Sequence, residues 1–69
     1  MDHSGIVSFL KERRTLLGLT QQALSDLSGV TLRTIKNIEG GALPSVRNLM
    51  LVAEALGLEL KLEVKKMSR

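Results

Sequence analysis

Apolar residues recur every three or four positions in three parts of the chain, the period of helices that bury one face. The first part, residues 4–17, starts at Ser4, a favourable N-cap residue, and Gly18 stops it. One broad side of this predicted helix holds Ile6, Phe9, Leu10, Arg13, Leu16 and Leu17. We therefore expect this side to pack on a core.

Residues 20–41 predict two short helices joined by a tight turn. Thr20 is a good N-cap for the first helix, and Leu24 and Leu27 give that helix its apolar side. Gly29 can adopt the positive φ that a sharp turn requires. The second helix begins directly after this turn.

The second helix of this pair has two different sides. At about 100° per residue, Ile35 and Ile38 point the same way with Thr31 between them. The opposite side is basic and carries amides: Arg33, Lys36 and Asn37, with Leu32 at its edge. The pattern predicts a helix-turn-helix whose second helix presents polar side chains outward.

A last helix is predicted over residues 45–56, after a loop that contains Pro44 and before Gly57. Ser45 is its expected N-cap. Its expected core stripe consists of Val46, Leu49, Met50, Ala53 and Leu56. Leu51 falls outside this stripe, so it is either an ordinary exposed leucine or part of a subunit contact.

Residues 58–65 change to strict alternation, the period of a half-buried strand. A helix there would place Glu59 near Glu63 and Lys61 near Lys65, and both pairs repel. A strand instead gathers its apolar residues on one face: Leu58, Leu60, Leu62 and Val64. Because no other strand is predicted, its pairing partner must come from another molecule. We expect two copies to pair antiparallel, as a homodimer.

Composition narrows the class of protein. The chain has 69 residues, a net charge of +3 and no cysteine, so it predicts one small domain with no disulfide. We expect residues 1–57 to form the domain, and 58–69 to form the dimerisation strand and a short basic tail. No apolar run could span a bilayer and no signal sequence is recognisable, which favours a cytoplasmic protein without membrane contact.

Enzymatic chemistry has little support in the sequence. The single histidine, His3, precedes the first predicted helix and has no cysteine or paired carboxylates nearby. Gly40 and Gly41 are not followed by the lysine of a phosphate-binding loop, and the carboxylates are scattered singly. We therefore expect no enzyme, no metal and no cofactor.

Duplex DNA suits the candidate binding residues better. Phe9 is the only aromatic residue, whereas readers of single strands and RNA use several aromatic platforms. Arg33 can bind guanine in bidentate fashion, Asn37 adenine, Lys36 guanine or a phosphate, and Leu32 a thymine methyl. Expected phosphate contacts lie at helix starts. They are Gln21 and Gln22, and more weakly Ser45 and Arg47.

The segments GLTQQALSDLSGV, TLRTIKNIEGG and LPS resemble the phage-repressor-like (Xre/Cro-type) DNA-binding domains, and the resemblance runs from about Leu10 to Leu58. It implies an all-α, lambda-repressor-like domain of four helices, here with a C-terminal β-strand that pairs across a dimer. It also places Thr31 and the outward residues of the second helix in the major groove of double-stranded DNA. Ser25, where the family usually has alanine, and Gly40 are mild departures.

The resemblance implies two further features. Arg14 matches a family arginine that pairs with the glutamate ending the recognition helix, here Glu39, although Arg13 is a rival partner and both charges could instead be solvated. The short build is similar to the HipB-type antitoxins, which neutralise a kinase-like toxin and repress their own operon. The alternatives are a free-standing phage-like regulator and a bridging module that does not read bases.

Overall fold

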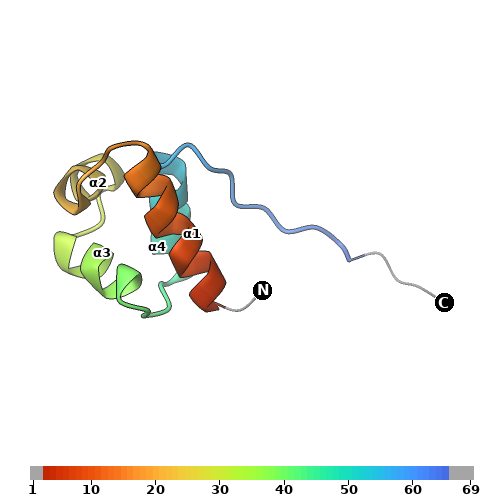
Figure 1. The fold of residues 1–69 in the computed structure, drawn as a ribbon. Helices are drawn as coiled ribbons and strands as arrows, with labels where there is room; N and C mark the ends of the chain where they lie inside the picture. The colour runs from red at the N-terminus through yellow and green to blue at the C-terminus, as the bar shows by residue number, and fades with distance from the viewer. Residues whose placement is uncertain (1–2, 66–69) are drawn as a thin grey trace.

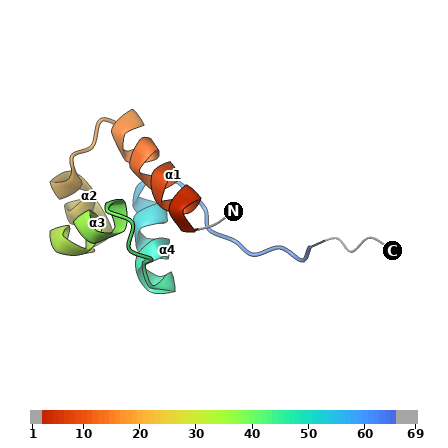
Figure 2. The same cartoon turned by 60° about the horizontal axis from the view of Figure 1, so that its bottom comes forward.

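The computed structural model describes residues 3–65, with the backbone alone at residues 3 and 4. Its four helices are α1 (His3–Leu16), α2 (Gln21–Ser28), α3 (Leu32–Glu39) and α4 (Val46–Ala55). They pack into one body, from which the segment after α4 runs outward (Figure 1). The turned view in Figure 2 shows the same arrangement, with α2 and α3 together at one end of the body.

Local side-chain contacts define where three of the helices begin. Thr20, Thr31 and Ser45 are the N-caps of α2, α3 and α4, and each hydroxyl accepts a hydrogen bond from the backbone amide three residues later. A cap of this kind contributes about 1 kcal/mol. The predicted caps Thr20 and Ser45 are therefore confirmed. Thr31 was expected on the inner side, but it is the exposed cap of α3.

The core lies where all four helices meet. Its largest fully buried side chains are Leu24, Ile35, Val52 and Leu56, each at most 2% exposed. The buried cluster as a whole consists of Val7, Leu10, Leu24, Val30, Ile35, Ile38, Val52 and Leu56. The helix α3 is thus anchored through Ile35 and Ile38, as predicted.

The predicted inner side of α1 and α2 was wrong in part. The helix α1 begins at His3, so Ser4 lies within it and is not its N-cap. Val7 and Leu10 are buried, whereas three apolar residues assigned to the inner side of α1 are exposed: Phe9, Leu16 and Leu17. Leu27 of α2 is also exposed, at 63%. The apolar residues span a wider arc than the neighbouring helices can cover.

The core stripe of α4 was also misplaced. Val52 is buried although it was not assigned to the stripe, and Leu51 packs partly against the core. Val46 and Met50 are exposed at 70% and 52%. Periodicity could not select the buried side here, because α4 carries apolar residues around most of its circumference.

Residues 58–65, which were predicted to be a strand, form none in the single chain. Residues 3–57 contain no strand either. Leu58 packs partly against the core, but Leu62 and Val64 are 99% and 98% exposed. A strand requires a partner for its backbone groups, which one copy alone does not supply. Pairing between two copies therefore stays a prediction.

Residues 3–65 contain neither a membrane-spanning helix nor a cluster of metal-binding side chains. None of the four helices has the length and apolar character needed to cross a bilayer. No group of histidine and carboxylate side chains in this part of the chain is arranged to hold a metal ion. The predicted basic tail, residues 66–69, lies outside the described residues.

Candidate nucleic-acid interface

The turn between α2 and α3 holds the two helices in a fixed relation. Gly29 has φ 77°, and its amide donates to the Ser25 carbonyl at 3.0 Å. The Ser25 hydroxyl then donates to the Val30 carbonyl at 2.6 Å, while the Val30 amide donates to the Ser28 hydroxyl at 3.1 Å. Val30 itself is buried. The Ser25 hydroxyl thus adds a side-chain hydrogen bond to the turn.

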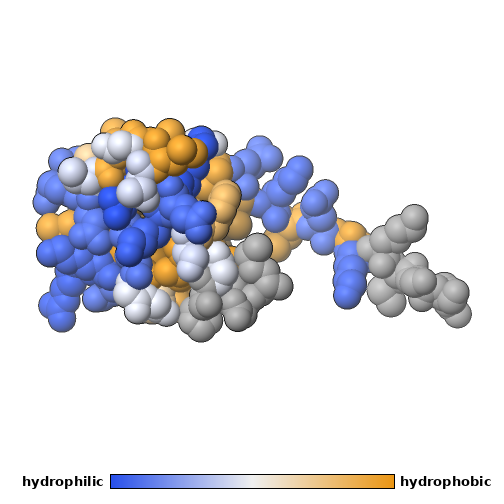
Figure 3. Space-filling view, in the orientation of Figure 1, coloured by the Kyte–Doolittle hydropathy of each residue, from blue (hydrophilic) through white to orange (hydrophobic). Residues whose placement is uncertain are grey.

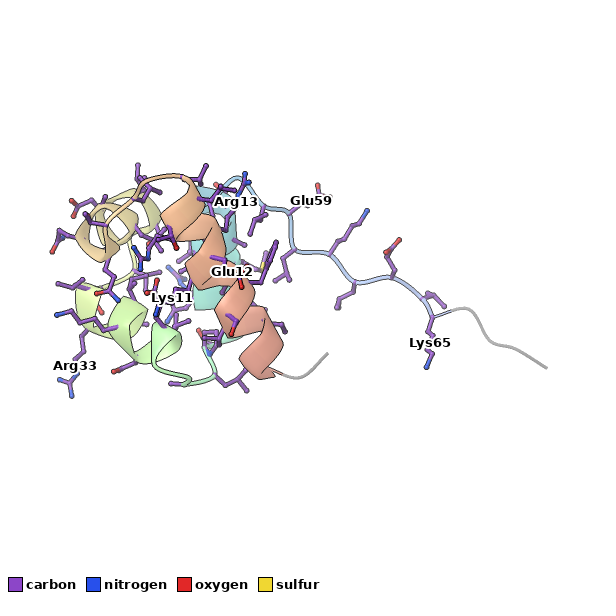
Figure 4. The ribbon with its side chains drawn as sticks, viewed as in Figure 1. Lys11, Glu12, Arg13, Arg33, Glu59 and Lys65 are labelled. Carbon is purple, nitrogen blue, oxygen red and sulfur yellow. The ribbon has the colours of Figure 1, made fainter. Side chains whose placement is uncertain are left out.

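The outer side of α3 follows from the burial of its inner side. Since Ile35 and Ile38 are buried, the side chains of Arg33, Lys36 and Asn37 lie in solvent. Arg33 projects away from the body in Figure 4. Hydrophilic side chains cover most of the body's surface on the α2 and α3 side in Figure 3. We call Arg33, Lys36 and Asn37 the outer face of α3.

The outer face carries donors that suit base edges. None of its three side chains has a hydrogen bond or salt bridge to another residue in the part of the chain described here. Their free guanidinium, ammonium and amide groups match the acceptors and donors that a major groove displays. Leu32, at the edge of this face, is half-buried, so only part of its side chain could meet a thymine methyl.

Thr31 is less available than the outer face. Its hydroxyl accepts from the Thr34 amide at 3.2 Å and donates to the Thr34 hydroxyl at 2.9 Å. Both interactions belong to the start of α3. Thr31 therefore positions the first turn of this helix, and its contact with DNA stays a prediction.

Gln21 and Gln22, the predicted phosphate contacts at the start of α2, differ in their surroundings. The half-buried Gln21 donates from Nε2 to Glu39 Oε1 at 3.0 Å. The exposed Gln22 donates to Asp26 Oδ1 at 2.9 Å within α2. An amide nitrogen has two hydrogens, so Gln21 can still donate one to a phosphate while it holds Glu39.

Arg14 and Glu39 form a bidentate ion pair that joins α1 to α3. Arg14 Nε lies 2.6 Å from Glu39 Oε2, and Nη2 lies 2.9 Å from Oε1. Arg14 Nη1 also donates to the Leu19 carbonyl at 2.7 Å. The two side chains are only 12% and 7% exposed. With Gln21, this network fixes α1, the loop before α2, α2 and α3 in one arrangement.

The pair changes the pKa values of both its members. The hydrogen bond to Glu39 raises the pKa of Arg14 above its usual value, despite desolvation. Burial by itself would raise the pKa of Glu39, but the hydrogen bonds from Arg14 and Gln21 outweigh it, together with the positive charges of Arg14 and Lys11. The pKa of Glu39 is therefore lowered, and the pair is fully charged at neutral pH.

Arg13, the rival partner of Glu39, has a different contact. Its Nε donates to the Leu56 carbonyl at 2.9 Å, at the C-terminal end of α4. This hydrogen bond ties α1 to α4. The two adjacent arginines thus hold α1 against two different helices.

Sequence reasoning did not find three of these contacts: Gln21 to Glu39, Arg14 to Leu19, and Arg13 to Leu56.

Ser45 caps α4 by accepting from the Asn48 amide at 3.1 Å, and Arg47 is exposed on the first turn. Ser45 and Arg47 stay predicted phosphate contacts, since nothing places them against a duplex.

The two capped helices, their fixed turn and the outer face of α3 define a DNA-binding helix-turn-helix protein. The helix-turn-helix family model matches residues 10–62, so the chain belongs to this family, whose Xre/lambda-repressor-like members are transcription regulators and generally not enzymes. Comparison with curated proteins and with solved structures found no match.

Proposed function

We propose that the protein is a sequence-specific transcriptional repressor that binds a palindromic operator as a homodimer. The observation that supports this function most strongly is the outer face of α3. Arg33, Lys36 and Asn37 lie together in solvent on a helix whose other side is anchored in the core. A recognition helix needs this combination of free base-reading groups and a rigid support.

Each side chain of the outer face has a distinct role in the proposal. Arg33 binds the O6 and N7 acceptors of guanine, and Asn37 binds N6 and N7 of adenine. Lys36 binds guanine or a phosphate. Gln21 and the free backbone amides at the start of α2 bind a phosphate and set the register of α3 on the duplex.

The homodimer is supported by the exposed apolar side chains of the segment after α4. Leu62 and Val64 are almost fully exposed in the single chain, and a second copy can cover them. Two-fold symmetry would then match the symmetry of a palindromic operator.

Charge favours one register for antiparallel pairing of the two segments. Centring the two-fold axis on Leu62 places Glu59 opposite the partner's Lys65 and Lys61 opposite the partner's Glu63. It also places Leu60 opposite the partner's Val64. Centring on Lys61 or on Glu63 opposes like charges, and centring on Leu60 keeps only the Glu59 to Lys61 complement. Cross-strand pairs contribute roughly 0.2–1 kcal/mol each.

Selection from a random pool of duplex DNA tests the proposed function. We expect the protein to enrich an inverted repeat whose half-sites lie about one helical turn apart. Retention of duplexes without any sequence enrichment would instead identify a bridging module that does not read bases. Enrichment of a single half-site would contradict the dimer.

An antitoxin role is a second candidate, supported by the apolar segment that follows α4 almost directly. In this role the protein also binds and neutralises a kinase-like toxin. The test is whether a neighbouring gene encodes such a protein and whether the two purified proteins form a stable complex. Without such a neighbour or complex, the free-standing regulator is the remaining form of the proposal.

A further inference from the structure

An apolar groove runs along α1 and α4 where the chain leaves the body. Two adjoining hollows form it, with volumes of about 290 and 480 Å³. Both are lined by Ile6 and Leu49 together with Leu60. Phe9, Val46 and Met50, which also line the groove, are 52%, 70% and 52% exposed. Apolar side chains are visible at this side of the body in Figure 3.

We propose that this groove is the docking surface for residues 62–65 of a second copy, with the partner's Val64 as the side chain that enters it. This inference rests on the proposed homodimer and adds the surface that holds it together. The apolar residues that sequence analysis assigned to the core and that are exposed in one copy thus become buried between two copies.

The chain's own course shows how the groove continues into a second copy. Leu58 packs against the core, Leu60 lines both hollows, and Leu62 lines the second hollow. All of residues 58–62 therefore line the groove, Glu59 and Lys61 included, and its apolar lining from this segment comes from the even-numbered side. In the register centred on Leu62, the partner's Val64 lies beside Leu60 on this same side, directly over the groove.

The chain cannot easily fill the groove with its own Val64. To reach the groove, Val64 would have to turn back immediately after Leu60. Residues 58–65 contain no glycine, proline, asparagine or aspartate, the residues that tight turns use most. Accordingly, the segment runs outward without reversing in Figure 1.

Charge at the end of the groove also fits a second copy. Glu54 and Glu59 line one hollow there with Met50, Leu58 and Leu60, and neither carboxylate has a salt bridge within residues 3–65. Lys65 of the same chain is at the far end of the segment from Glu59 (Figure 4). Antiparallel pairing brings the partner's Lys65 to Glu59 instead.

Matched substitutions of exposed residues test the docking surface. Met50→Lys changes the groove, and Leu27→Lys changes an exposed leucine of α2 that lines neither hollow. Both side chains are more than half exposed, so both variants should keep their helical circular dichroism. We expect Met50→Lys to raise the dimer dissociation constant by about 100-fold, since each dimer has two grooves. Leu27→Lys should leave it unchanged in analytical ultracentrifugation.

Disulfide trapping gives a second measurement, and it is clean because the chain has no cysteine of its own. A mixture of Met50→Cys and Val64→Cys copies should form a cross-linked heterodimer under mild oxidation. A mixture of Leu27→Cys and Val64→Cys copies should not.

The outcomes separate this inference from the proposed function. If Met50→Lys stays as dimeric as the unsubstituted protein while Leu62→Lys becomes monomeric, the docking surface is wrong and the homodimer stands. A protein that is monomeric both free and on selected DNA would overturn both. Cross-linking of Val64→Cys to Leu27→Cys as readily as to Met50→Cys would also overturn the docking surface.

Discussion

Replacing Arg14 by methionine tests how strongly the buried ion pair stabilises the domain. The substitution keeps an unbranched side chain but removes two hydrogen bonds to Glu39 and one to the Leu19 carbonyl. Glu39 would then keep only the hydrogen bond from Gln21, with its side chain 7% exposed. Leaving a charge buried without its partner costs about 3–5 kcal/mol.

The double variant, with Arg14→Met and Glu39→Met combined, should lose much less unfolding free energy than the two single variants together. Removing both charges leaves no buried charge behind, and replacing a buried pair by apolar side chains is often nearly neutral. The two hydrogen bonds between Arg14 and Glu39 involve charged groups, each worth about 1.5–3 kcal/mol. We therefore expect a coupling energy of about 3 kcal/mol between Arg14→Met and Glu39→Met.

Urea unfolding followed by far-ultraviolet circular dichroism is the appropriate assay, because the chain has no tryptophan or tyrosine. Arg13→Met is the matched control: Arg13 contacts the Leu56 carbonyl and not Glu39. The loss of unfolding free energy caused by Arg13→Met should therefore add to the loss caused by Glu39→Met. Additive values for Arg14→Met and Glu39→Met would refute the reasoning.

Three further predictions concern the same elements. Because the pKa of Glu39 is lowered in the folded state, the stability that its charge contributes should be complete above about pH 4.3 and disappear as the pH falls through the lower folded value; the stability difference from Glu39→Gln, measured by urea unfolding, should shrink over that range. Gly29→Ala should lower the unfolding free energy by roughly 1–2 kcal/mol, because φ 77° is unfavourable for alanine although its Cβ meets no atom; no loss in a urea titration would contradict this. Gln21→Ala should weaken binding to operator and scrambled duplexes by the same factor in fluorescence anisotropy, because a phosphate contact carries no sequence information; a changed ratio of the two affinities would contradict it.

Features set by neighbouring residues were predictable from the sequence. The caps Thr20 and Ser45 and the positive φ of Gly29 depend on a few consecutive residues, so their residue types were sufficient. The anchoring side of α3 was also predictable, since Ile35 and Ile38 are its only strongly apolar residues after Leu32. Four helices and their order followed from these local features.

Features set by packing were not predictable in the same way. α1 and α4 have apolar residues on more than one side, and the sequence does not say which side the other helices cover. Phe9 and Met50 were therefore assigned to the core of a single chain, although both are exposed. The contact of Gln21 with Glu39 depends on how α2 and α3 are oriented, which no spacing encodes. The Arg14 to Glu39 pairing was suggested by the family resemblance together with the places of both residues at the margins of buried faces.

The most direct test of whether the outer face of α3 reads bases is a ratio of two affinities. One is the affinity for the duplex that the protein selects from the random pool, and the other is the affinity for a scrambled duplex. Arg33→Ala and Asn37→Ala should each reduce the difference in binding free energy between the two duplexes by about 1–3 kcal/mol, because each removes a bidentate contact to a base. Glu12→Ala, an exposed change on α1, should leave the ratio unchanged. An unchanged ratio for Arg33→Ala and Asn37→Ala would contradict the assignment of the recognition face.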